Sequence, residues 1–131
     1  MRTKGQVEAQ ISEALVKFEK EYMGRGPYET KTFIMGDMVL VRLKGVLTLA
    51  EQQLAKSGPG NLGTGKNLIK QVRMELLEKA RPILEKIIQK TTGASVVSLH
   101  TDVSTVTGER IIIFTLDRDL PFTNSPPRKR E

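Results

Sequence analysis

Four residues at the end of the first predicted helix, Gly24-Arg25-Gly26-Pro27, combine backbone freedom with one fixed cation. Glycine lets the backbone approach another group closely, and a guanidinium pairs with a carboxylate or another anion through two parallel hydrogen bonds. The same residues also have a purely structural interpretation. In that case Gly24 caps the helix, Pro27 stops it, and Arg25 faces solvent or pairs with Glu29. The spacing predicts a binding or docking corner and leaves both interpretations open.

A second cation, Lys66, follows a glycine-rich segment that is similar to a phosphate-binding loop. Residues 60–67 read GNLGTGKN, which matches the pattern GxxxxGK but has Asn67 where that loop needs Ser or Thr to hold magnesium. The loop also needs a preceding strand, whereas a helix precedes it here. These departures favour a linker between two helices over a nucleotide site, so no cofactor is implied. The amides that open the next helix could still bind a single anion together with Lys66.

Arg73, His100 and Asp102 are the remaining candidates for polar chemistry. Arg73 lies beside Val72 on a long helix and outside its runs of Lys and Glu, so we expect it to share a polar site with Arg25. His100 and Asp102 alternate on one side of a strand, where they could orient a base or bind a metal. Because the sequence supplies no nucleophile and no third partner, we predict a protein that is not an enzyme. Catalysis through His100 and a carboxylate is the last of three alternatives.

Composition narrows the class of protein further. The 131 residues fit one domain, and zero Cys with a single His argue against disulfides, thiolate chemistry and a metal site. No run approaches the roughly 20 apolar residues that a membrane span needs, so we expect a soluble, cytoplasmic protein. The 21 Lys and Arg against 15 Asp and Glu give a net charge of +6. Acidic residues interleave with the basic ones and no aromatic stacking surface accompanies them, which argues against nucleic acid as the partner.

Hydrophobic periodicity predicts an order of α-β-β-α-α-β-β. We expect helices over residues 6–23, 48–56 and 66–92, and strands over residues 28–35, 38–43, 95–102 and 110–116. Thr48 and Glu51 form a capping box, and Pro82 predicts a kink or a break between two helices near Arg81. The unbroken apolar run over residues 110–116 predicts a central strand that is buried on both faces. This order is typical of an α+β two-layer sandwich, with helices on one face of a four-stranded, mainly antiparallel sheet.

Residues 1–120 form a single predicted domain, and residues 57–65 a flexible, glycine-rich loop. Residues 121–131 have too little apolar content to pack and are predicted to be a disordered basic tail. Because the helices can cover only one face of the sheet, apolar side chains on the other face need a second partner surface. We therefore expect a homodimer, formed through the sheet or through the long helix.

A set of motifs spread over residues 6–117 resembles a bacterial family of unknown function labelled MpsC-like. The set comprises Gly24–Pro27, the hairpin after it, Leu47–Glu51 with Leu54, Val72 and Arg73 on a long helix, Thr92-Gly93 before Val96, and Asp102. The family label refers to a sodium-translocating, membrane-potential-generating system linked to inorganic carbon uptake. The resemblance implies an accessory protein and supplies no catalytic residues. The glycine-rich segment 57–65 and the basic tail depart from the family pattern.

The resemblance and the residues together predict a non-catalytic accessory or regulatory protein of a membrane ion or bicarbonate system. We expect it to dock on a membrane-complex partner through the Gly24–Pro27 corner and the helix that begins at Thr48. Its location would then be cytoplasmic and peripheral to the inner membrane, which suits a positive net charge. The alternative is a nucleic-acid, nucleotide or anion-binding module that uses the basic surface.

Overall fold

The computed structural model describes residues 2–56 and 64–122. Its elements are α1 (Lys4–Phe18), the π-helix η1 (Glu19–Met23), β1 (Glu29–Met35), β2 (Met38–Lys44), α2 (Leu49–Ala55), α3 (Thr64–Thr92), β3 (Val96–Val103) and β4 (Arg110–Leu116). Since η1 continues α1, the predicted order of α-β-β-α-α-β-β is confirmed. The fold is the predicted α+β class.

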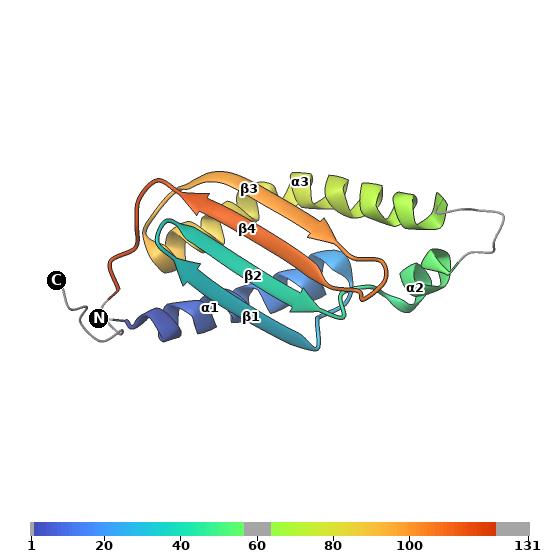
Figure 1. The fold of residues 1–131 in the computed structure, drawn as a ribbon, viewed down its shortest axis with the longest axis horizontal. Coiled ribbons are helices and arrows are strands. Elements are labelled where there is room, and N and C mark those ends of the chain that lie inside the picture. Colours follow the sequence, from blue (N-terminus) through green and yellow to red (C-terminus); the bar gives the residue numbers. More distant parts are fainter. Residues whose placement is uncertain (1, 57–63, 123–131) are drawn as a thin grey trace.

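The four strands form one antiparallel sheet in the order β1-β2-β4-β3. Figure 1 shows α1 and α3 lying against the same face of this sheet, while α2 lies beyond its end. The predicted central position of β4 is confirmed, but its predicted burial on both faces is wrong. Ile112 and Phe114 face the helices and are buried, whereas Ile111 and Ile113 are only half-buried on the face that no described helix covers.

The core lies between the sheet and the two long helices. Its fully buried side chains include Ile11 and Leu15 of α1, Leu77, Leu84 and Ile88 of α3, and Val39, Val41, Leu43, Ile112 and Phe114 of the sheet. Each buried aliphatic or aromatic side chain contributes roughly 1.5–3 kcal/mol of transfer free energy. This core fixes the positions of the helix ends and strand ends where the candidate sites lie.

Helix α3 runs through Pro82 as one helix of 29 residues, so of the kink or break predicted near Arg81, the break is wrong. A proline inside a helix costs about 3 kcal/mol because it removes one backbone hydrogen bond and clashes with the preceding turn. Buried residues on both sides of it, Ala80 before and Leu84 and Ile88 after, belong to the same stripe against the core. Continuous packing on both sides of the proline holds the helix together.

The first helix changes its winding before it ends. Glu19–Met23 form a π-helix, and Gly24 ends it in the left-handed region at φ 87°, which confirms the predicted glycine cap. A π-helical turn shifts the side chains that follow out of the 3.6-residue period, and such turns are frequent at functional sites. Here the turn begins with Glu19, a fully buried carboxylate.

Two apolar surfaces stay exposed. On α3, the predicted apolar set divides into a buried stripe and an outer stripe, and the outer stripe consists of Leu68, Val72, Leu76 and Ile83. On the open face of the sheet, Phe33 and Met35 of β1 are exposed beside half-buried Leu40 and Ile113. These are the two surfaces through which the sequence predicted a homodimer.

Parts of two sequence predictions lie outside the described residues. The glycine-rich loop predicted over residues 57–65 falls there for residues 57–63, while Thr64 and Gly65 already belong to α3, which begins two residues earlier than predicted. The predicted tail falls there for residues 123–131. The described chain includes Phe122, which packs with Leu120 against the core, just beyond the predicted domain end at residue 120.

Candidate functional site

The Gly24–Pro27 corner connects η1 to β1 and brings Arg25 next to the end of β2. The half-buried Arg25 donates from Nε to the carbonyl oxygen of Gly45 at 3.0 Å. Glu29, the partner considered from the sequence, instead pairs with Lys31 and Lys44, each at 3.5 Å. Arg25 is therefore anchored through one nitrogen, and its terminal nitrogens have no acceptor among the described residues.

Gly45 allows this corner to close. Its φ is 76°, and a side chain at this position would overlap the ring of Tyr28. The amide of Gly45 donates to the carbonyl oxygen of Gly108 at 3.1 Å, which ties the end of β2 to the turn between β3 and β4. Only glycine satisfies both the positive φ and the close approach of the aromatic ring.

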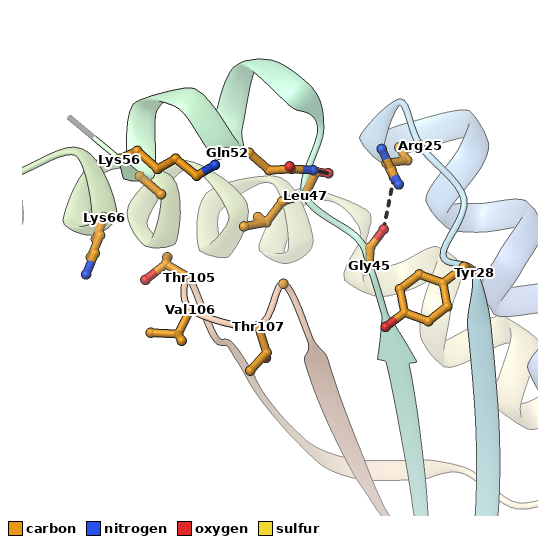
Figure 2. Close-up of a pocket in the computed structure, with 12 residues that line it drawn as sticks. Arg25, Tyr28, Gly45, Leu47, Gln52, Lys56, Lys66, Thr105, Val106 and Thr107 are labelled. Carbon is orange, nitrogen blue, oxygen red and sulfur yellow. Dashed lines mark hydrogen bonds between the residues drawn. The ribbon is translucent and has the colours of Figure 1, made fainter.

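A cavity of about 530 Å³ opens between this corner, α2, the start of α3 and the β3–β4 turn, and we call it the corner groove. Figure 2 shows Arg25 and Tyr28 at one end of the corner groove and Lys56 and Lys66 at the other. Apolar atoms come from Leu47, Ala55 and Val106, and the remaining lining residues are Gly45, Gln52, Thr105, Thr107 and Gly108. In the described chain its lining holds three cations and no carboxylate, so the corner groove suits an acidic or anionic occupant.

The structure brings two of the predicted site residues into the corner groove, Arg25 and Lys66. Gly24 and Gly26 shape its edge: Gly24 ends η1, and Gly26 lies against the side chain of Lys20 so closely that a Cβ would come within 2.8 Å of it. Pro27 precedes the bend at Tyr28, which leads into β1. The prediction of an anion or docking site at Arg25 therefore stays a prediction, now with a defined cavity.

Arg73 does not line the corner groove but is 2% exposed in a second polar site. Its Nε donates to Glu51 Oε2 at 2.9 Å, and its Nη2 donates to Glu51 Oε1 and to the carbonyl oxygen of Val46, each at 2.7 Å. Arg25 and Arg73 thus bind adjacent carbonyl groups, those of Gly45 and Val46, without sharing a cavity. Glu51 also caps α2, since its Oε1 accepts from the Thr48 amide at 2.8 Å and its own amide donates to Thr48 Oγ1 at 3.1 Å, which confirms the predicted capping box.

Glu19 and Arg110 complete what we call the buried ion cluster, which consists of Glu19, Glu51, Arg73 and Arg110. Glu19 is fully buried and lies 3.7 Å from Arg73 Nη1 through Oε1 and 3.7 Å from Arg110 Nε through Oε2. Both separations exceed hydrogen-bond distance. Burial raises the pKa of the Glu19 carboxyl above its ordinary 4.5, against the opposing charges of Arg110 and Arg73. Burial also lowers the pKa of the Arg110 guanidinium, although Glu19 opposes that shift.

Sequence reasoning missed Glu19 and Arg110, although a signal was present for Arg110 and for the burial of Arg73. Arg73 stands four residues after buried Ile69 and four before buried Leu77, so it occupies a core position of α3. Arg110 likewise alternates with Ile112 and Phe114 on the inward face of β4. A charged residue at a position where the periodicity demands an apolar one points to a buried ion pair.

His100 and Asp102 lie on the open face of the sheet, away from the corner groove. His100 Nε2 lies 3.3 Å from Ser98 Oγ, and Asp102 pairs with Lys70 at 3.3 Å. Within residues 2–56 and 64–122 no group of three or more His, Asp or Glu side chains is arranged to hold a metal ion.

Comparison with known proteins identifies the family of this chain. Residues 3–118 match the family described as "Na+-translocating membrane potential-generating system (MpsC)". The chain belongs to this family. It is also 45% identical over 119 residues to the uncharacterized protein YbcI of Bacillus subtilis (strain 168), an alignment that covers 91% of this chain and 92% of YbcI. No solved structure matches the chain.

The family assignment confirms the resemblance stated from the sequence motifs. The matched range contains the described residues of both the corner groove and the buried ion cluster. Among the helices of the described ranges, none combines the length and the apolar character needed to cross a bilayer.

Proposed function

We propose that this chain is a non-catalytic accessory component of a membrane-potential-generating, Na⁺-translocating system. Membership of the MpsC family over residues 3–118 is the observation that carries this proposal. The protein acts on the cytoplasmic side of the membrane, where it binds a membrane-embedded subunit. No step of ion transport is assigned to the chain itself.

The corner groove is the proposed docking surface, and its occupant is an acidic segment of that membrane-embedded subunit. Three cations from separate elements, Arg25, Lys56 and Lys66, line it without any carboxylate among its described lining residues. Val106 adds apolar surface, since it is 84% exposed at the tip of the β3–β4 turn, whereas Leu47 is 3% exposed. A short peptide that places an Asp or Glu among the cations and an apolar side chain against Val106 complements this lining.

Co-purification tests the docking surface. The chain is co-expressed with the membrane-embedded subunit and purified from detergent-solubilised membranes. The amount of subunit that co-purifies is compared for the wild type and the double variant Arg25→Gln with Lys66→Gln. The matched control is Lys31→Gln with Arg42→Gln, which removes two cations from the open face of the sheet. We expect the groove variant to lose at least about tenfold in recovery at low salt, because charge complementarity dominates encounter and register.

Three outcomes of this experiment carry different meanings. Loss of recovery by the control variant alone would move the docking surface to the open face of the sheet and contradict the assignment. Equal recovery of all variants would remove charge complementarity as the basis of docking. If no subunit is recovered, but short RNA binds with a salt dependence that the groove variant reduces, the corner groove serves nucleic acid instead.

We further propose that two copies of the chain pair through the outer stripe of α3. Leu68, Val72 and Leu76 line a shallow groove of about 270 Å³ together with Glu75 and Lys79. An antiparallel arrangement about a two-fold axis puts these apolar residues against their counterparts. The axis then passes near Val72 and Leu68 of each copy faces Leu76 of the other, so the stripe is complementary to itself in shape and apolar character.

Two variants of equal exposure distinguish this interface from the sheet. Leu76 is 42% exposed on α3 and Phe33 is 43% exposed on the open face, so a glutamate at either site disturbs the monomer little. Light scattering should report a dimer for the wild type and for Phe33→Glu, and a monomer for Leu76→Glu. A monomeric wild type, or loss of the dimer by Phe33→Glu alone, contradicts the proposed interface.

A further inference from the structure

A small cavity of about 90 Å³ lies beside the buried ion cluster, where the first half of α3 passes the edge strand β3 and the start of β4. The polar residues that line it are Lys70 and Arg73 of α3, Thr101 and Asp102 of β3, and Arg110 of β4. None of these residues lines the corner groove. The cavity is therefore a separate site, and its ligand can be tested without the proposed partner.

Some of the hydrogen-bond donors around this cavity have no acceptor among the described residues. Arg110 is 2% exposed, and within the described chain its guanidinium makes no hydrogen bond; Glu19 Oε2, at 3.7 Å from Nε, is its one ion-pair contact. Arg73 Nη1 and Thr101 Oγ1 are also buried without a hydrogen-bond partner. A buried guanidinium has five donors, and leaving them unsatisfied carries the full desolvation penalty of a charged group. Glu19 Oε1 and Oε2 also lack hydrogen-bond partners and lie 3.7 Å from Arg73 Nη1 and Arg110 Nε, so the donors left for an acceptor from outside the chain are the terminal nitrogens of Arg110 and the hydroxyl of Thr101.

We propose that this cavity binds one small oxyanion, held by the guanidinium groups of Arg110 and Arg73 and by the hydroxyl of Thr101. Lys70 at the entrance is paired with Asp102, and Glu19 and Glu51 balance the charges of the two arginines, so the cavity gains a net positive charge when Glu19 takes up a proton. The volume sets the size of the ligand: about 90 Å³ equals the liquid volume of roughly three waters, and pockets for drug-sized molecules begin near 300 Å³. Bicarbonate, sulfate or phosphate fits this volume.

Glu19 competes with the oxyanion for the same two arginines. The charged or titratable groups that face it are Arg73 on α3, Arg110 on β4 and Glu51 on α2. A bound anion withdraws the positive charge that favours the ionised carboxylate, so binding is coupled to uptake of a proton by Glu19. Affinity for an anion of constant charge therefore falls as pH rises, and Glu19→Gln removes this dependence.

Calorimetry and thermal shift test the site with sodium sulfate, phosphate and bicarbonate, each at constant ionic strength against chloride. At least one oxyanion should bind and raise the melting temperature of the wild type. Thr101→Val removes one donor with little change in size and should weaken that binding at least about threefold. Arg110→Gln should abolish binding of the oxyanion. Because this variant can also unfold the domain, the test also uses Thr101→Val and Lys70→Gln, which should weaken binding in a folded protein. Arg42→Gln on the open face is the control and should leave the affinity unchanged.

The comparison of anions identifies the ligand, and sulfate titrations from about pH 5 to 8 report the proton coupling. We expect the sulfate affinity of the wild type to fall over this range and that of Glu19→Gln to stay level. If none of the three anions binds above the chloride baseline, the inference is wrong. It is equally wrong if Thr101→Val binds like the wild type while Arg25→Gln loses binding, because the anion then lies in the corner groove.

Discussion

Replacing Glu19 by Gln tests the buried ion cluster most directly, because it removes one titratable charge and nearly keeps the side-chain size. Burial raises the pKa of the Glu19 carboxyl above 4.5, in spite of the nearby charges of Arg110 and Arg73. The folded chain therefore holds this proton more tightly than the unfolded chain does. The stability contributed by Glu19 is complete below pH 4.5, and it is lost as pH rises through the folded pKa.

The size of the effect follows from proton linkage. One proton bound by the folded state alone gives a slope of about 1.4 kcal/mol per pH unit. With a urea m-value of about 2 kcal/mol per M, the urea midpoint of the wild type should fall by about 0.7 M per pH unit relative to Glu19→Gln between pH 4.5 and the folded pKa, and should level off above it. Urea unfolding followed by circular dichroism at a series of pH values above 4.5 measures this difference. The test is how the difference in urea midpoint between the two proteins changes with pH. A difference that stays constant with pH does not report proton binding.

Glu51→Gln is the matched control, because Glu51 belongs to the same cluster and its pKa moves the other way. Burial alone would raise the pKa of the Glu51 carboxyl, but the hydrogen bonds from Arg73 and from the Thr48 backbone outweigh burial and lower it. Its contribution to stability is present above pH 4.5 and is lost as pH falls through the lowered pKa. Parallel urea midpoints for the wild type and Glu19→Gln at every pH above 4.5 would refute a proton-binding Glu19.

Three further substitutions test the elements that hold the sites, each read as the free energy of unfolding in urea. Thr48→Ala removes the oxygen that accepts from the Glu51 amide at 3.1 Å and should cost about 1 kcal/mol; an unchanged stability would mean that this cap contributes nothing. Gly45→Ala should cost more than Gly93→Ala: both residues have positive φ, worth about 1–2 kcal/mol, but only at Gly45 would the Cβ meet a ring. Leu84→Ala should cost about 2–5 kcal/mol because it opens a cavity in the core, whereas Leu68→Ala on the exposed outer stripe should cost far less in the monomer; equal losses would contradict the division of α3 into two stripes.

The order of the elements along the chain could be predicted because each strand carries a local signal. The predicted run over residues 110–116 coincides with β4, and the capping box at Thr48 sets the start of α2. Such features depend on neighbours within a few residues, which periodicity and capping rules describe. The same rules place Gly24 at the end of the first helix, because the residue that ends a helix often adopts a left-handed backbone conformation, which glycine tolerates best.

The candidate sites could be predicted only in part, because they depend on contacts between distant segments. Arg25 meets Gly45, and Glu19 meets both Arg73 and Arg110, across separations that no local pattern encodes. The π-helical turn adds to the difficulty, since it rotates the residues after Phe18 away from the stripe that the 3.6-residue period predicts.

The corner groove and the small cavity beside the buried ion cluster are linked through one short backbone segment, Gly45-Val46. Arg25 donates to the carbonyl oxygen of Gly45 on one side, and Arg73 donates to that of Val46 on the other. Arg73 also holds Glu51, whose carboxylate caps α2, and α2 supplies Lys56 close to its end as part of the groove lining. An anion that shifts Arg73 away from Glu51 would therefore act on the cap of α2 and on one wall of the corner groove. Linkage then requires reciprocity: the factor by which the anion changes partner affinity must equal the factor by which the partner changes anion affinity.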